Sequence, residues 1–239
     1  MNFHVADLMA VAIARRLKND DKVFHGVASP LPMVAILLAK NLYVENLTYL
    51  NITGGINVLP EKLSKSTDGP ELTYRTEGKF DLSDIFDLGA RGELDVAFLS
   101  GVQVDGKGRL NSSVIGEYDT PKVKLPGGAG SAVLVPNVKK AFIWRTKHDP
   151  RTMVEDVDFV TTQGNVYKVF TPLCIFGKDE EGLYLDKLLG ETSLKEVKKM
   201  TGFEIRYKKN QVESEPLPTQ EEIDMLNKID PSGIRYIEF

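Results

Sequence analysis

Apolar and polar residues in the first hundred positions switch repeatedly between helical and strand-like spacing. Residues 5–18 carry apolar side chains at helical intervals and end in cations, which the helix dipole favours there. Residues 94–100 form a nearly continuous apolar run, typical of a strand buried on both faces of a parallel sheet. The pattern predicts alternating elements: helices over 5–18, 32–42 (opened by the prolines of 29–32) and 81–92, and strands over 22–27, 47–52 and 94–100.

After residue 110 the rhythm changes to a glycine-rich loop at 125–130, a strand at 139–145 and short strands with turns over 155–185. Two capping boxes, Ser193 with Glu196 and Thr219 with Glu222, predict two further helices. Without internal repeats, this order favours an α/β fold with an open, mainly parallel sheet and flanking helices. We expect a single domain over residues 1–239.

Composition excludes several classes of protein. The 239 residues include 30 Lys and Arg and 34 Asp and Glu, so the net charge of −4 argues against non-specific binding of nucleic acid. The single Cys174 forms neither an internal disulfide nor a cysteine zinc cluster, and the three histidines show no metal-ligand spacing. We expect Cys174 to be an inert core residue. No apolar run approaches the ~20 residues that span a bilayer, and we expect a cytoplasmic protein without a membrane or metal partner.

The segment 100–116 follows the apolar strand directly, at the strand end where α/β proteins place ligands. Two interpretations stay open. The sequence VQVDGKGRL is typical of a β-hairpin, because Asp-Gly is a strong turn signal. Alternatively, the segment is a binding loop whose polar and small residues meet a ligand: Ser100, Gly101, Gln103, Asp105 and Asn111.

The segment LPGGAGSA at 125–132 is the second candidate. Its residues Gly127, Gly128, Ala129 and Gly130 allow a close backbone approach and present N–H donors, as in loops that cradle anions. The spacing matches neither the P-loop nor the dinucleotide fingerprint. A flexible turn explains these residues equally well.

The third candidate is the end of the strand at 47–52. Covalent acyl catalysis needs a carboxylate there, but the chain offers Asn51, Ile52, Thr53 and Gly54. The nearest downstream carboxylate, Glu61, lies in a polar stretch and is expected to be solvated. His25 ends a neighbouring strand; a core histidine is the more frequent situation, although it could face the site.

Taken together, the segments 26–40, 98–116, 125–132 and 229–235 resemble the β subunit of family I CoA-transferases, most closely the glutaconate CoA-transferase type. The resemblance implies a CoA-transferase-like fold and one active site shared by an α and a β subunit, in a heterodimer or heterotetramer. It also implies that Gly127, Gly128 and Ala129 line the CoA side of that site, and that Gln103, Asp105 and Asn111 shape the loop beneath it. The substrate would be an acyl-CoA, with no permanently bound cofactor.

The sequence departs from the family at two positions. Where transferases carry a nucleophilic glutamate, this chain has Ile52, and Ala28 stands where a second glycine is usual. A subgroup without this glutamate resembles the chain; there the α partner supplies the carboxylate and the complex hydrolytically opens a ring of a CoA-linked steroid fragment. Three functions therefore stay open: a CoA-transferase subunit, a subunit of such a hydrolase, and a non-catalytic scaffold subunit. A sugar-phosphate isomerase-like enzyme is disfavoured, because we find no self-sufficient acid–base pair.

Overall fold

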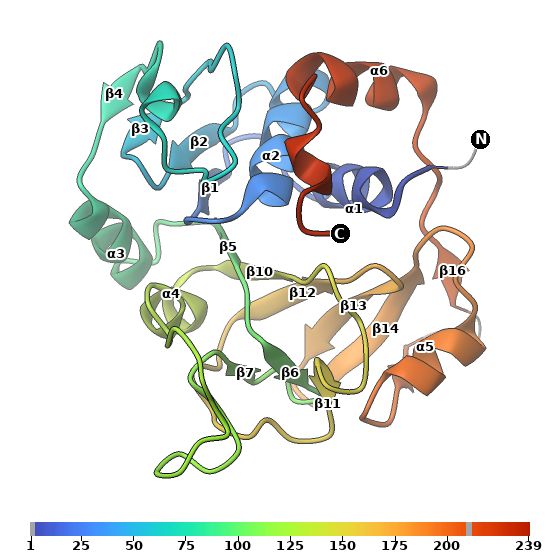
Figure 1. Ribbon diagram of the computed structural model, residues 1–239. Coiled ribbons are helices and arrows are strands. Elements are labelled where there is room, and N and C mark those ends of the chain that lie inside the picture. The colour runs from blue at the N-terminus through green and yellow to red at the C-terminus, as the bar shows by residue number, and fades with distance from the viewer. Residues whose placement is uncertain (1–2, 209–211) are drawn as a thin grey trace. The chain divides into compact units, whose positions relative to one another are not determined.

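The computed structural model describes residues 3–208 and 212–239, and the chain divides into two compact units. Unit 1 comprises Met1–Phe98 and Pro216–Phe239, and unit 2 comprises Leu99–Glu215. The ribbon in Figure 1 follows the chain from the blue elements of unit 1 through green and orange unit 2 to the red elements that complete unit 1. The prediction of a single domain stays a prediction.

Parallel strands form the centre of the sheet in unit 1. Strand β1 (Lys22–His25) pairs in parallel with β2 (Thr48–Asn51) on one side and with β5 (Val96–Leu99) on the other. The short strands β3 (Gly55–Ile56) and β4 (Gly78–Lys79) extend this sheet in antiparallel pairing. Most residues of the three parallel strands are buried, which explains their unbroken apolar sequences.

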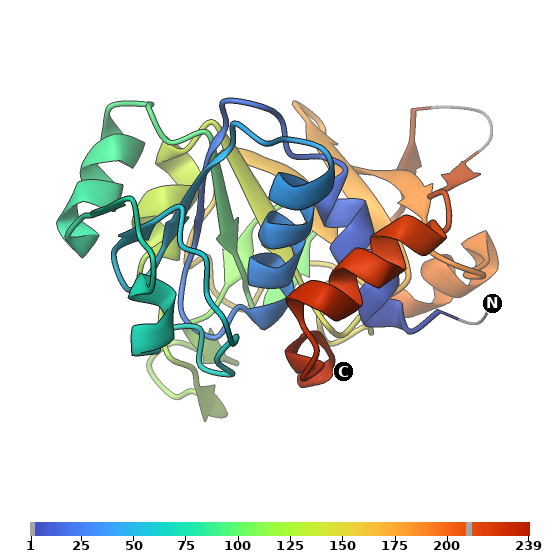
Figure 2. The same ribbon diagram turned by 90° about the horizontal axis from the view of Figure 1, so that it is seen from above.

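Three helices of unit 1 pack on one another: α1 (Val5–Ala14), α2 (Pro30–Leu42) and α6 (Gln220–Ile229). Figure 2 shows α2 beside both α1 and α6. Every residue of α2 from Pro30 to Ala39 is buried, as expected for a helix that is apolar all round. A fourth helix, α3 (Leu82–Ala90), and two 3₁₀ turns, Pro70–Thr73 and Ile234–Tyr236, complete the unit.

The capping box predicted for α6 is confirmed, and its glutamate has a second role. Thr219 Oγ1 accepts the Glu222 N–H at 3.3 Å, and Glu222 Oε2 accepts the Thr219 N–H at 2.6 Å. The same carboxylate forms a two-point ion pair with the Arg15 guanidinium, at 2.7 and 2.8 Å, and accepts the hydroxyl of Tyr43. One carboxylate therefore caps α6 and attaches it to the end of α1.

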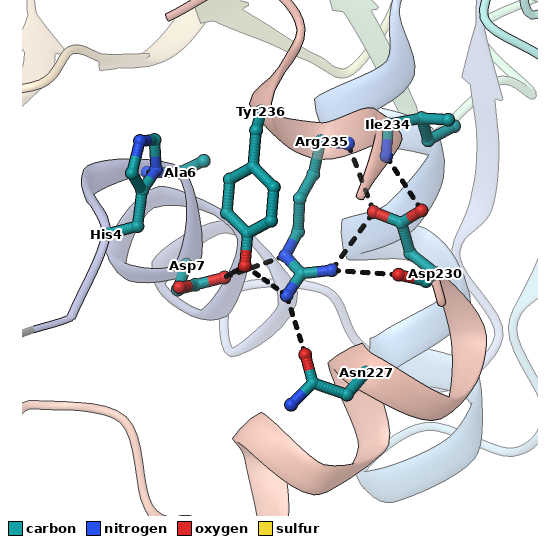
Figure 3. Close-up of polar contacts among 8 residues, drawn as sticks. All are labelled: His4, Ala6, Asp7, Asn227, Asp230, Ile234, Arg235 and Tyr236. Carbon is teal, nitrogen blue, oxygen red and sulfur yellow. Dashed lines mark hydrogen bonds and ion pairs between the residues drawn. The ribbon is translucent and has the colours of Figure 1, made fainter. Parts of the chain in front are cut away.

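A buried arginine attaches the last turn of the chain to α1 (Figure 3). The Arg235 guanidinium is 2% exposed; it donates to Asp7 Oδ1 at 2.7 Å and to Asp230 Oδ2 at 3.0 Å. Its remaining donors reach Asn227 Oδ1 at 2.9 Å and the hydroxyl of Tyr236, which itself donates to Asp7. Because both carboxylates and the guanidinium are hydrogen-bonded on all sides, the cost of burying their charges is offset.

Unit 2 contains a mixed sheet and two smaller ones. The parallel pair β10 (Lys140–Trp144) and β12 (Val166–Phe170) continues into the antiparallel strands β13 (Cys174–Asp179) and β14 (Gly182–Leu188). The remaining elements are β6 (Gln103–Asp105), β7 (Leu110–Asn111), β8 (Val114–Ile115), β9 (Val123–Lys124), α4 (Ser131–Asn137), β11 (Met153–Val154), α5 (Leu194–Met200), β15 (Arg206–Tyr207) and β16 (Glu213–Ser214).

The predicted α/β class with flanking helices is confirmed, and most predicted elements are found within a few residues of their expected ends. The strand expected over 157–162 is wrong, because this segment forms only an isolated bridge between Thr162 and Leu110. The N–H groups of both Thr161 and Thr162 bond to the carbonyl of Leu110, at 2.9 and 3.2 Å. Two successive donors on one acceptor leave no regular ladder to propagate. In the part of the chain that the structure describes, no helix is long and apolar enough to cross a membrane.

Candidate active site

The segment after β5 is a hairpin, as one of the two sequence interpretations predicts. Strands β6 and β7 pair in antiparallel fashion, with Gln103 opposite Asn111. The side chain of Asn111 donates to Gln103 Oε1 at 2.7 Å, and the same oxygen accepts the N–H of Asp158 at 3.0 Å. Gln103 is 5% exposed and Asn111 is fully buried, so their polar groups hold the hairpin and a neighbouring loop together.

Asp105 organises the tip of this hairpin. Its buried carboxylate accepts the N–H groups of Lys107 and Arg109, both at 3.0 Å, and the Arg109 Nε at 2.6 Å. The hydrogen bond to Asp105 is the main cause that raises the pKa of Arg109 above its ordinary value. These partners occupy the Asp105 oxygens inside the turn, so the side chain acts on the loop that it shapes.

Ser100 and Gly101 lie at the entry to the hairpin. The Ser100 hydroxyl donates to the Trp144 carbonyl at 2.9 Å, which fixes it against β10. Gly101 is buried, and a side chain on it would begin 3.2 Å from the Cβ of Leu110. Both residues therefore fit the close packing at this point of unit 2.

The glycine-rich loop lies directly against the far end of this hairpin. The Gly127 N–H donates to the Ser112 carbonyl at 2.7 Å, and the Leu125 N–H donates to the Ser113 carbonyl at 2.9 Å. Thr161 fills the space behind both segments: its hydroxyl accepts the Ser112 N–H at 2.8 Å, and its methyl lies 2.9 Å from where a Cβ on Gly128 would be. The two loops that carry the sequence signals are therefore neighbours within unit 2.

The backbone of this loop presents donors outward. Gly127 has φ +95° and Ala129 has φ +41°, conformations in which successive N–H groups converge toward one side. The N–H groups of Gly128, Ala129 and Gly130 bond to nothing within residues 3–208 and 212–239. The loop is partly to fully exposed and leads into α4. A loop of this kind is built to receive an oxyanion or a phosphate.

The end of β2 in unit 1 is organised by Asn51. Its buried Oδ1 accepts the N–H groups of Thr53 and Gly55, at 3.0 and 3.1 Å, and its amide donates to the Leu72 carbonyl at 2.8 Å. Gly54 has φ +87°, and a Cβ there would lie 2.3 Å from the Phe80 carbonyl oxygen, so only glycine fits this turn. Ile52, the first residue beyond the strand, is half-buried and brings no ionisable group to this position.

Glu61, the nearest downstream carboxylate, is exposed. It lines a shallow depression of about 560 Å³ with residues 62, 70, 71 and 73–75. Within the described residues no group of three His, Cys, Asp or Glu side chains has the arrangement of a metal site.

A buried polar cluster at the end of β1 was not predicted as a unit. His25 is fully buried; its Nε2 lies 2.6 Å from the Tyr49 hydroxyl, and its Nδ1 lies 2.9 Å from Ser29 Oγ. Burial lowers the pKa of His25 to about 4, so the imidazole is neutral at physiological pH. Its position at a strand end was visible in the sequence, but the pairing with Tyr49 depends on the register between β1 and β2, which the spacing does not give.

Unit 2 contains a second buried histidine. His148 lies between the hydroxyls of Thr171 and Thr201, at 2.8 and 2.9 Å, and 3.9 Å from the Cys174 sulfur. Burial lowers the pKa of His148 to about 4 and raises the pKa of Cys174 to about 12. The thiol is therefore protonated and shielded, in agreement with the expected core role.

Comparison with known proteins decides the family. The family described as Coenzyme A transferase matches residues 6–203. This chain belongs to the coenzyme A transferase family. The resemblance carried by the four sequence segments is thus confirmed, and the neighbouring loops of unit 2 are parts of a CoA-transferase chain.

The relatives of this CoA-transferase chain include β subunits of two-subunit enzymes. The β subunit of the 3-oxoadipate CoA-transferase of Pseudomonas knackmussii is 30% identical over 245 residues, which cover 94% of this chain and 92% of the relative. The β subunit of the glutaconate CoA-transferase of Acidaminococcus fermentans is 25% identical over 170 residues, 68% of this chain and 62% of the relative.

Solved structures share the fold over nearly the full length. The decarboxylase AibA/AibB matches with a TM-score of 0.93 and 27% identity, covering 99% of both chains. The glutaconate coenzyme A-transferase of Acidaminococcus fermentans matches with a TM-score of 0.85 and 21% identity, covering 96% of both chains. The latter likeness shows the fold alone.

Proposed function

We propose that this chain is the β-type subunit of a two-subunit enzyme that transforms an acyl-CoA at a site shared with an α-like subunit. The observation that carries the proposal is the outward row of free N–H groups at Gly128, Ala129 and Gly130, in a chain related over 94% of its length to the β subunit of a CoA-transferase. These donors suit the phosphates or the carbonyl oxygen of a CoA thioester. The enzyme would work in the cytoplasm without a resident cofactor.

The side chain at Ile52 limits what this subunit contributes to the chemistry. In the family resemblance this position belongs to the carboxylate that attacks the thioester, and isoleucine has neither a nucleophile nor a base. The reacting carboxylate or activated water would therefore be supplied by the partner. This chain would provide backbone donors and the walls of the pocket.

Ile52 also favours a second candidate, in which the complex changes the acyl group without transferring CoA. The likeness to the decarboxylase AibA/AibB, at 27% identity, supports a family member whose chemistry is not transfer. Ring-opening hydrolysis of a CoA-linked intermediate belongs to the same candidate. In both cases the acyl-CoA is bound by the same backbone donors.

Reconstitution with an α-like chain from the same genome tests the proposal. We expect activity on acyl-CoA from the complex and none from either chain alone. After incubation with acyl-CoA and reduction with borohydride, this chain should stay unlabelled, because it lacks a glutamate at position 52. A glutamyl adduct trapped on this chain, or activity of the chain alone, would contradict the proposal. Free CoA without a CoA-acceptor acid distinguishes hydrolysis from transfer.

The donor loop is tested by Gly128→Val, whose side chain would collide with Ala132 and Thr161, both 2.9 Å from the Cβ position. We expect the KM for acyl-CoA to rise at least tenfold, because the displaced loop no longer presents its N–H groups together. Gly92→Ala is the matched control, since a Cβ on Gly92 meets no atom within 4 Å. An unchanged KM in Gly128→Val would exclude this loop from substrate binding.

A further inference from the structure

Three donors converge on one backbone carbonyl in unit 1, the carbonyl of Gly26. Ser29 Oγ donates to it at 2.5 Å and Thr67 Oγ1 at 3.3 Å, and His25 Nδ1 lies 3.0 Å away. The three donating side chains are at most 3% exposed. A carbonyl oxygen has two lone pairs, so three buried donors around it are more than local hydrogen bonding requires.

These contacts also fix the proton positions on the histidine. The Gly26 carbonyl can only accept, so His25 Nδ1 carries the hydrogen and donates to it. In the neutral ring Nε2 is then an acceptor, and the Tyr49 hydroxyl donates to it at 2.6 Å. Tyr49 is fully buried and has no need of solvent to complete this bond. The result is a relay from Tyr49 through His25 to the Gly26 carbonyl.

Holding this carbonyl inward turns the next N–H outward. The peptide between Gly26 and Val27 is trans, so the Val27 N–H points opposite to the carbonyl that the buried donors hold. Val27 is 59% exposed, and its N–H bonds to no residue in the part of the chain that the structure describes. Ala28 fixes the other side, because it adopts φ +47° and donates its N–H to the Ser66 carbonyl at 3.1 Å.

The outward N–H lies beside the position of the missing nucleophile. His25 pairs with Asn51 in the parallel register of β1 and β2, so residues 26–27 and 52–53 continue side by side beyond the two strand ends. Neighbouring strands are about 4.8 Å apart, which is within the length of a thioester group. A carbonyl placed at Ile52 would therefore lie next to the Val27 N–H.

We propose that the Val27 N–H is an oxyanion donor for the thioester carbonyl of the substrate, and that Tyr49, His25, Ser29 and Thr67 are positioning residues that hold it outward. This inference rests on the proposed acyl-CoA function. When a carboxylate adds to the thioester carbon, the π electrons of the C=O bond move to its oxygen, and the Val27 N–H stabilises that charge. Collapse restores the C=O bond, forms an anhydride and expels the CoA thiolate. No proton passes through His25 in this step.

Val27→Pro removes the donor directly, because proline has no N–H. Val27 is not among the residues with positive φ, so its backbone is open to the substitution. In the reconstituted complex we expect kcat to fall about 100-fold or more, as for a lost oxyanion donor, with KM changed less than threefold. A kcat within threefold of the wild type would overturn the inference. If the wild-type complex itself has no activity on acyl-CoA, the proposed function fails instead.

Ser29→Ala tests the positioning role and stands in if Val27→Pro does not fold. We expect kcat to fall three- to tenfold at constant KM, because the Gly26 carbonyl loses its closest donor, and Ser29→Thr should recover at least half of the loss. Ser64→Ala is the matched control: this exposed serine bonds only to Ser66 Oγ at 3.1 Å. A purely structural role predicts lower thermal stability with unchanged kcat in the folded fraction, and that result would overturn the inference.

Discussion

Replacing Arg235 by methionine tests how strongly the buried ionic network holds the two ends of unit 1 together. The change removes the cation from two carboxylates, Asp7 and Asp230, that are 7% and 2% exposed, and leaves them without their main partner. Breaking a buried pair in this way costs about 3–5 kcal/mol of unfolding free energy. For a protein of this length the loss corresponds to a decrease in Tm of about 10 °C. Urea and thermal denaturation followed by circular dichroism measure both quantities.

The matched control is Arg91→Met. Arg91 pairs with Glu93 at 3.5 Å, and their side chains are 56% and 50% exposed, so this change should cost less than about 1 kcal/mol. The double variant Asp7→Asn with Arg235→Met should lose less than the sum of the single losses, because Asp7 is no longer a charge without a partner. Equal losses in Arg235→Met and Arg91→Met, or strict additivity in the cycle, would refute the reasoning.

Two further predictions concern pH and backbone strain. Burial lowers the pKa of both His25 and His148 to about 4, so between pH 6.5 and 4 the unfolded chain binds more protons than the folded one. Stability should therefore fall as the pH drops below 6.5, by about 2 kcal/mol per histidine at pH 5, in urea titrations of the wild type. A flat stability between pH 7 and 5 would contradict the neutral, buried state of both rings. Gly54→Ala should cost about 2–3 kcal/mol, because its Cβ meets a carbonyl oxygen at 2.3 Å in a left-handed conformation. Gly92→Ala, also left-handed but in open space, should cost only about 1 kcal/mol, and equal costs would show that the contact is relieved.

Local sequence rules predicted the elements that carry their own signals. The apolar run at 94–100 became the buried strand β5, and the capping box at Thr219 opens α6. The Asp-Gly turn produced a hairpin. In each case the residues that decide the structure lie within a few positions of one another, so spacing alone is informative.

Contacts between distant segments could not be predicted in this way. The placement of Thr161 behind two loops, and of Tyr49 beside His25, depends on strand register and on how the chain returns. The same limit explains the wrong strand over 157–162: its β-like composition is genuine, but its backbone donors are used by a single carbonyl of β7. Whether the free N–H groups of unit 2 and the outward N–H of Val27 act on one substrate is a question for the complex.

The order in which this protein can acquire its structure follows from the division of unit 1 between the two ends of the sequence. Unit 2 is one continuous stretch, Leu99–Glu215, and can fold as soon as that stretch has left the ribosome. Helices α1 and α2 must wait for α6 and Arg235, which are synthesised last. Until then the apolar surface of α2 is incompletely covered, so a nascent or truncated chain should be a preferred client of chaperones.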